Sequence, residues 1–294
     1  MENNSIPATT QDALIPAQMA LKAEQTGVLK ANLDFLTTFM LAVLAGSFIA
    51  LGAIFATTVT AGSGGILSYG VSRLLGGLAF CIGLILVVVA GAELFTGNNL
   101  IVMAWASRKV STGKLLRNWG IVYAGNLAGS LLTAVLILLS GQYLFGNGAV
   151  GVNALNIAAA KVNLGFLQAL ILGMLCNALV CLAVWLTLSA RSVTDKILAI
   201  IFPITAFVAA GFEHSVANMY FIPVGLMIKR LAPATFWEQT GLVASDYADL
   251  TWGAFLVDNL LPVTIGNIGG GGLMVGAVYW LIYLRNIEKT NGSS

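Results

Sequence analysis

The feature that most constrains this chain is a series of six apolar stretches, each long enough to cross the ~30 Å hydrocarbon core of a membrane as a helix. Apolar residues make up 58% of the 294 positions and charged residues only 9%, far from the balance of soluble domains. Within the stretches, the only acidic, basic or histidine side chains are Glu93, Glu213 and His214. The sequence predicts an all-α integral membrane protein with six spans, at about residues 35–57, 76–104, 118–140, 164–188, 197–228 and 259–284.

The composition also argues against several classes of function. The predicted spans cover most of the chain and leave no room for a soluble catalytic domain. A net charge of +2 gives no reason to expect a nucleic-acid partner. An enzyme inside the bilayer would need a nucleophile with a base or a metal cluster, and Cys81, Cys176 and Cys181 lack the spacing of metal ligands. We expect no enzymatic activity, no metal and no cofactor.

Lysine and arginine residues predict the orientation. Ten of the 14 fall on one side of the predicted topology and four on the other, and the positive-inside rule assigns the richer side to the cytoplasm. Both termini are therefore expected in the cytoplasm, and no removable signal peptide is expected. The poorer side carries Arg73, Lys161, Lys229 and Arg230.

Two segments in the middle of spans two and five resemble each other. AGAELFTGNN (90–99) matches AGFEHSVANM (210–219), which aligns Glu93 with Glu213 and Asn98 with Asn218. Spans three and six also match, and spans one and four share the Phe39–Gly46 and Phe166–Gly173 spacing. The pairs in spans three and six are Asn118 with Asn259, Gly125 with Gly266, and Asn126 with Asn267.

Duplication of three spans predicts two repeats, residues 35–140 and 164–284, joined by an extracytoplasmic loop at 141–163. An odd number of spans per repeat inverts the second repeat, an arrangement typical of channels and transporters. We expect spans two and five to break at TGNN and HSVAN, because irregular backbone at membrane depth is tolerated only where it lines a cavity or is buried. Half-helix N-termini there would favour a small anion.

The polar residues at these breaks allow more than one role. His214 is the only histidine, can titrate near neutral pH, and is a functional candidate because of its depth. Glu93 and Glu213 are expected to brace the breaks, with a proton relay as the alternative. Asn126 and Asn267 are expected to tie span three or six to the breaks, with direct substrate contact as the alternative. Thr96 either serves the path or bonds back to its own helix.

Four motifs carry a resemblance to a known family. AGAELFTGNN, KLLRNWGIVYAGNLAG, AGFEHSVANMYFIP and DNLLPVTIGNIGGGG resemble the formate channel branch of the formate/nitrite transporter family, over about residues 30 to 285. The resemblance implies an aquaporin-like fold of inverted 3+3 repeats, assembled as a homopentamer with one pore per protomer. It also implies a bacterial inner (cytoplasmic) membrane location.

The resemblance also implies site residues. Thr96 and His214 would face each other at the pore centre, flanked by Asn177 and Asn267, and Lys161 would draw anions into the outer vestibule. Helix-break support would come from Glu93, Glu213, Asn98, Asn218 and Asn126. Constrictions would be formed by Leu84, Leu94, Phe95 and Val180 on the cytoplasmic side and by Phe80 and Phe207 on the other. Gly97 stands where a hydroxyl residue is expected in formate members, which keeps a nitrite or hydrosulfide channel of the same fold as an alternative.

The expected substrate is formate or a similar small anion. Low dielectric at the centre raises the pKa of a weak acid, and an imidazolium can hand over a proton, so formate could cross as formic acid. Passive anion flow and strict proton coupling are the alternative modes. The cytoplasmic N-terminal arm (1–34) is expected to form a helix at 17–29 that gates the pore with pH, touches a cytoplasmic formate-handling enzyme, or lies at the interface without gating. The tail (285–294) is expected in the cytoplasm.

Overall fold

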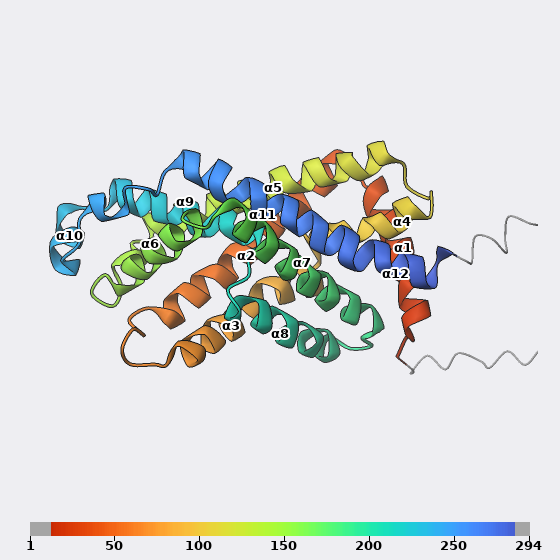
Figure 1. Cartoon of the computed structure of the whole chain (residues 1–294), viewed down its shortest axis with the longest axis horizontal. Coiled ribbons are helices and arrows are strands. Elements are labelled where there is room, and N and C mark those ends of the chain that lie inside the picture. The colour runs from red at the N-terminus through yellow and green to blue at the C-terminus, as the bar shows by residue number, and fades with distance from the viewer. Residues whose placement is uncertain (1–12, 286–294) are drawn as a thin grey trace, which may run out of the picture.

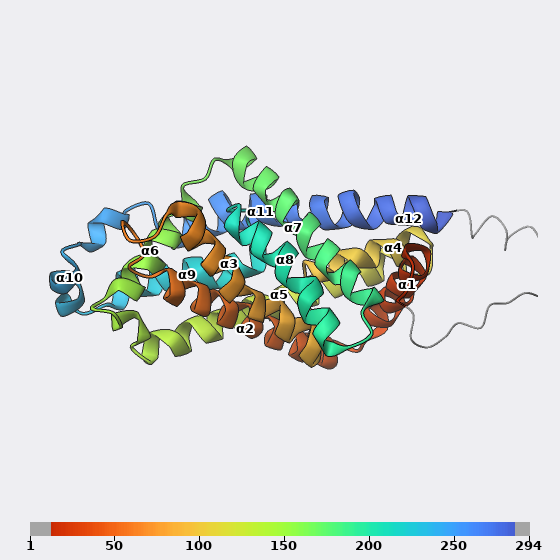
Figure 2. The same cartoon turned by 90° about the horizontal axis from the view of Figure 1, so that it is seen from below.

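The computed structural model describes residues 13–285, and this range is helical with no strand (Figures 1 and 2). The first half contains α1 (Pro16–Asn32), α2 (Phe35–Thr60), α3 (Tyr69–Leu86), η1 (Val87–Gly91), η2 (Gly97–Ile101), α4 (Val102–Ala106), α5 (Thr112–Leu139) and η3 (Gln142–Leu144). The second contains α6 (Ala149–Val162), α7 (Phe166–Ser189), α8 (Val193–Ala209), α9 (Ser215–Leu231), α10 (Ala234–Thr240), η4 (Ala244–Tyr247), η5 (Ala254–Leu260), α11 (Leu261–Ile268), η6 (Gly269–Ala277) and α12 (Val278–Tyr283).

Five helical stretches among the described residues are long and apolar enough to cross a membrane. They are Phe35–Thr60, Tyr69–Gly91, Thr112–Leu139, Phe166–Ser189 and Ala254–Tyr283. The further span predicted at 197–228 is divided, because α8 ends at Ala209 and α9 begins at Ser215. Each of these helices has 17 residues and is about 25 Å long, so neither spans the bilayer core alone.

Both breaks begin at a glycine in the left-handed region. The π-helical turn η1 ends at Gly91, with φ of 83°, and the corresponding Gly211 after α8 has φ of 76°. An L side chain is strained at such a φ, so these glycines allow the chain to leave the helix. The predicted positions of the breaks were therefore a few residues too late: TGNN lies at the start of η2, and HSVAN lies at the start of α9.

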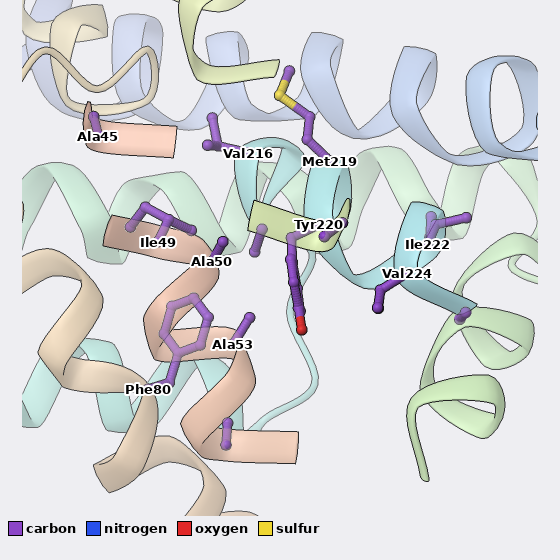
Figure 3. Close-up of a cluster of buried hydrophobic side chains, with 14 of the residues drawn as sticks. Ala45, Ile49, Ala50, Ala53, Phe80, Val216, Met219, Tyr220, Ile222 and Val224 are labelled. Atoms are coloured by element: carbon purple, nitrogen blue, oxygen red, sulfur yellow. The ribbon is translucent and has the colours of Figure 1, made fainter. Parts of the chain in front are cut away.

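Close helix packing depends on glycine. A Cβ on Gly129 of α5 would lie 2.0 Å from the carbonyl oxygen of Val43 on α2. A Cβ on Gly266 of α11 would lie 2.1 Å from that of Leu170 on α7. Helices α5 and α2, and α11 and α7, therefore approach with backbone against backbone. In Figure 3, side chains of α2 such as Ile49 gather beside Phe80 of α3 and the buried face of α9.

Helix α1 lies at the same end of the molecule as α12, and α6 and α10 lie at the other end (Figures 1 and 2). The apolar face of α1, including Met19 and Ala23, belongs to a buried cluster with Trp185 and Leu284. Glu24 of this helix is buried and paired with Lys109. Residues 1–12 of the predicted arm and 286–294 of the predicted tail lie outside the described residues.

Two segments that connect the long helices have defined local structure. Asp34 caps α2 by accepting the backbone N–H of Thr37 at 3.0 Å. Hydrogen bonds from the Thr37 hydroxyl and backbone hold the pKa of Asp34 below its ordinary value. Residues 141–163, predicted as a loop, contain η3 and α6, so Lys161 lies in the last turn of a helix.

Candidate functional site

The two helix breaks come together at the side chains of Thr96 and His214. Oγ1 of Thr96, from the first break, lies 2.9 Å from Nε2 of His214, from the second, and both side chains are buried. Nδ1 of His214 accepts the backbone N–H of Ala217 at 3.0 Å, so the histidine caps α9 with its own ring. Because Nδ1 is an acceptor, the neutral ring carries its proton on Nε2 and donates it to Thr96. The Thr96 hydroxyl hydrogen can then point at another acceptor.

One cavity opens toward α6, and we call it the α6 cavity. Its volume is about 450 Å³, and its wall includes Phe80, Phe207, His214, Lys161 and Glu213. The Phe207 ring stacks on the His214 ring with centroids 5.9 Å apart and meets Phe80 edge to face at 5.7 Å. The two phenylalanines therefore form an apolar surface directly beside the histidine.

A second cavity, of about 470 Å³, opens beside α1, and we call it the α1 cavity. Leu84, Leu94 and Gly97 line it, together with Lys30 and Glu93. Phe80 and Leu84 are separated by one turn of α3, about 6 Å along its axis. No described residue lines both cavities. His214 lines the α6 cavity and Gly97, next to Thr96, lines the α1 cavity, so the Thr96–His214 pair lies in the short barrier between them, beside Phe80 and Leu84.

A polar network supports the first break. Nζ of Lys30 lies 2.7 Å from Glu93 Oε1 and 3.0 Å from Asn98 Oδ1. Asn98 Nδ2 donates to Glu93 Oε2 at 2.6 Å and to Asn118 Oδ1 at 3.0 Å. Asn118 returns to Lys30 by donating to its backbone carbonyl at 3.2 Å. The buried carboxylate of Glu93 is thereby neutralised and fully hydrogen-bonded.

The second break has the same network. Nζ of Lys161 lies 2.7 Å from Glu213 Oε1, and Asn218 Nδ2 donates to Glu213 Oε2 and to Asn259 Oδ1, both at 2.7 Å. Asn259 Nδ2 donates to the Lys161 carbonyl at 2.9 Å. Two contacts differ. Asn259 Nδ2 also donates to Glu213 Oε2 at 3.2 Å, and Asn218 Oδ1 has no partner, since Lys161 Nζ instead lies 5.4 Å from the centroid of the Phe221 ring.

Two asparagines tie the breaks to neighbouring helices. Asn126 accepts the Phe95 N–H at 2.9 Å and donates to the carbonyls of Ala42 and Glu93. Asn267 accepts the Ser215 N–H at 2.9 Å and donates to the carbonyls of Gly173 and Glu213. Both side chains are fully buried and use their donors and acceptors within the protein.

These contacts correct the alignment of the first and fourth predicted spans. Lys30 and Ala42 occupy the places of Lys161 and Gly173, a shift of 131 positions. The spacing of Phe39 and Gly46 had suggested a shift of 127. In the breaks the shift is 120, which sets Leu94 against His214 and Thr96 against Val216. The central pair is therefore not duplicated, although the networks around it are.

A family profile for formate/nitrite transporters matches residues 17–281. The chain belongs to the formate/nitrite transporter family. It is 49% identical over 274 residues to the formate channel FocA of Escherichia coli (strain K12), covering 93% of this chain and 96% of that protein. It is 42% identical over 279 residues to FocA of Haemophilus influenzae, covering 95% of this chain and 96% of that protein.

Two solved structures resemble this family member. A pentameric formate channel with formate bound superposes with a TM-score of 0.82 at 50% identity, covering 85% of this chain and 98% of that one. An ion channel of the formate/nitrite transporter family superposes with a TM-score of 0.76 at 29% identity, covering 90% of this chain and 98% of that one.

Several predicted site residues of this transporter lie outside the walls of the two cavities. Among the candidate constriction residues, Phe95 packs edge to face against Trp119 and Tyr123, Val180 is buried, and neither lines the α6 or the α1 cavity. Asn177 is also fully buried and donates to Thr96 O, Asn99 Oδ1 and Asn267 O. Asn177 and Asn267 therefore position backbone beside the central pair rather than line a cavity.

Four residues of the site were missed by sequence reasoning. Lys30 was hidden by the incorrect alignment of spans one and four. Asn118 and Asn259 had been matched as a repeat pair, which was the available signal, but were given no role. Arg73 lines the α6 cavity, and nothing in its local sequence distinguished it from an ordinary loop-proximal cation. Among residues 13–285, no group of three His, Cys, Asp or Glu side chains is placed to hold a metal.

Proposed function

We propose that this protein is a membrane channel for formate and similar small monovalent anions. The observation that carries the proposal is the Thr96–His214 hydrogen bond in a short apolar barrier between two cavities. Family membership and the formate bound to the pentameric relative support formate as the substrate. The barrier excludes bulk water and larger solutes, and the pair supplies polar hydrogens within it.

The architecture that fits this function is six spans in two inverted repeats of three, with the second span of each repeat broken. It is supported by the equivalent glycines Gly91 and Gly211 and by the two matching networks. Both cavities and the barrier are built from one chain, so each protomer would carry its own pore. We propose a homopentamer by analogy with the solved relative.

The proposed location is a bacterial cytoplasmic membrane with both termini in the cytoplasm. Helices α1 and α12 lie at the same end of the molecule, which agrees with termini on one side (Figure 1). Most of the lysine and arginine residues are expected at that end. The α1 cavity would then face the cytoplasm, and the α6 cavity would face outward.

In the proposed transport step, a small anion leaves one cavity, passes the barrier and is held by hydrogen bonds from Thr96 and His214. The neutral ring suffices for this: while its Nε2–H donates to Thr96, the threonine hydroxyl hydrogen is free for the anion, and the Nε2–H becomes a second donor when the anion displaces the threonine oxygen. Proton transfer to formate from His214 would require an imidazolium. A second ring proton would have to occupy Nδ1, with loss of the Ala217 N–H bond. This local cost favours passive anion flow over obligatory proton exchange through the ring.

The N-terminal helix is proposed to control the cytoplasmic mouth. Lys22, Thr26 and Lys30 of α1 line the α1 cavity. The helix is held there by the Glu24–Lys109 pair and by the bond from Lys22 Nζ to the Leu188 carbonyl at 2.8 Å. Opening with pH would require breaking these contacts. A cytoplasmic formate-handling enzyme is a proposed partner that would compete for them.

The deciding experiment is anion flux in proteoliposomes. Formate, nitrite, hydrosulfide and chloride would be compared for the wild type and His214→Asn across a pH series. Asparagine can still cap α9 but has no imidazole, so the variant separates capping from ring chemistry. Preferred formate flux supports the proposal, whereas equal or greater nitrite or hydrosulfide flux assigns the other substrate.

The same series separates the transport modes. Formate current without a pH gradient supports passive flow. A pH dependence that disappears in His214→Asn would instead show that the ring exchanges protons. Thermal unfolding of the purified variant provides the control that a lost flux does not come from a lost fold.

A further inference from the structure

The charged residues on the wall of the α6 cavity are few. Among the described residues they are Arg73, Lys161 and Glu213. Lys161 and Glu213 are 2.7 Å apart, with side chains only 15% and 5% exposed, and form a buried ion pair. Their fields largely cancel at any distance from the pair, so Lys161 adds little net attraction for an anion in the cavity. The remaining net positive charge belongs to Arg73.

Arg73 is held in place by carbonyl groups. Its Nη2 donates to the Val208 carbonyl, and its Nε donates to the Ala209 carbonyl at 3.3 Å. These carbonyls lie in the last turn of α8, where the helix dipole presents partial negative charge. No described carboxylate forms an ion pair with Arg73. The two carbonyl groups therefore hold the guanidinium in place without neutralising its charge.

The remaining donors of Arg73 are free to meet a ligand. A guanidinium has five N–H groups, and the two carbonyl bonds use two of them. Gly211 follows α8 with a positive φ, and a Cβ there would lie 3.5 Å from Nη2. The glycine thus keeps the space beside the guanidinium open where the chain turns into the break.

We propose that Arg73 is the anion-collecting residue of the α6 cavity: a small monovalent anion binds its free N–H groups before crossing the barrier. This inference rests on the proposed channel function. It assigns to Arg73 the attraction of anions that the family resemblance implied for Lys161. Replacing Arg73 by glutamine removes the positive charge. It also weakens the hydrogen bonds to the carbonyl groups at the C-terminal end of α8, which leaves their partial negative charge exposed to the cavity. Both changes disfavour an anion in the cavity.

The α1 cavity supplies the matched variant. Lys30 is paired there with Glu93, and Lys22 bonds to the Leu188 carbonyl. Lys196 lines the same cavity, and its side-chain ammonium forms no ion pair with a described residue. Lys196→Gln therefore removes one unpaired charge from the opposite mouth. Its effect is expected on transport from that side only.

The test compares wild type, Arg73→Gln, Arg73→Lys and Lys196→Gln in vesicles whose orientation is scored by access to an N-terminal tag. Formate current is measured under holding potentials of either sign, which drive the anion in from one side or the other far from equilibrium, at about 20 mM and 500 mM ionic strength. At low salt Arg73→Gln should lower transport from the α6 side roughly two- to five-fold, a change expected for one unit charge in water-filled space. Arg73→Lys should retain most of it, and high salt should shrink the difference.

Three results would overturn the assignment of Arg73. They are equal losses from both sides, losses that persist at high salt, or no loss in Arg73→Gln. Lys196→Gln supplies the mirror control, with its loss from the α1 side. If the wild type carries no formate from either side, the proposed channel function fails, which is distinct from a working channel that ignores Arg73.

Discussion

Nζ of Lys161 lies 2.7 Å from Oε1 of Glu213, and this ion pair is the more buried of the two that support the breaks. Glu213→Gln should leave a buried ammonium without its anion and lower the free energy of unfolding by about 3–5 kcal/mol. Glu93→Gln should lower it less, because its partner Lys30 is 28% exposed and can reach water. Thermal unfolding in detergent measures both. Glu238→Gln, at an exposed position of α10, is the control and should change little. An unchanged midpoint for Glu213→Gln would contradict the structural role of the pair.

Thr96→Val should keep the shape of the central site but remove its hydroxyl. We expect formate flux to fall about ten- to a hundred-fold, because a hydrogen bond to a charged group contributes roughly 1.5–3 kcal/mol. Thr96→Ser keeps a hydroxyl and should retain most of the flux. Stopped-flow uptake into proteoliposomes gives the comparison. Equal flux in the valine and serine variants would remove Thr96 from substrate contact.

Gly129→Ala should force α5 and α2 apart. The added Cβ would meet the Val43 carbonyl oxygen at 2.0 Å, and relief of such overpacking costs about 1–3 kcal/mol. Gly120→Ala, on the same helix, meets nothing within 4 Å and should be neutral or stabilising by up to about 1 kcal/mol. The thermal unfolding midpoint should therefore fall for Gly129→Ala and stay unchanged or rise for Gly120→Ala. A stable Gly129→Ala protein would show that the helix contact can relax.

Gly97→Ser should fold normally and change anion preference. A Cβ at this position of the α1 cavity would meet only the Val184 side chain, at 3.6 Å. The added hydroxyl is expected to raise formate flux relative to nitrite about two- to five-fold, the value of one modest hydrogen bond. Gly97→Ala adds the carbon without the oxygen and is the matched control. If the alanine variant shifts the ratio equally, the change comes from volume.

The helices and the breaks could be predicted because they depend on local or duplicated patterns, whereas the facing of Thr96 and His214 was implied by the family resemblance. Apolar length gave the spans, and the Glu93–Glu213 register located both breaks to within several residues. The start of each break was displaced because Gly91 and Gly211, which turn the backbone, look like the many glycines that only permit packing. Their positive φ is not visible in the sequence.

The three-dimensional partners were harder to predict. The importance of Lys30 depends on a contact to Glu93 across 63 positions, and that of Arg73 on carbonyls of α8 more than 130 positions away. Lys161 was expected to draw anions into the vestibule; it lines the α6 cavity, but its ion pair with Glu213 was not predicted. Whether a lysine in a wall attracts an anion depends on its neighbour, and Glu213 could be identified as that neighbour only in the folded chain.

The alignment of Leu94 with His214 has a consequence for the direction of transport. Similar supporting networks lie on both faces of the barrier, and the single histidine and threonine form one shared binding point between them. A molecule that arrives from either face thus reaches the same donors after crossing one apolar layer. Such a path is reversible: it can empty the compartment that holds more substrate and later refill it, with the electrochemical gradient of the anion choosing the direction.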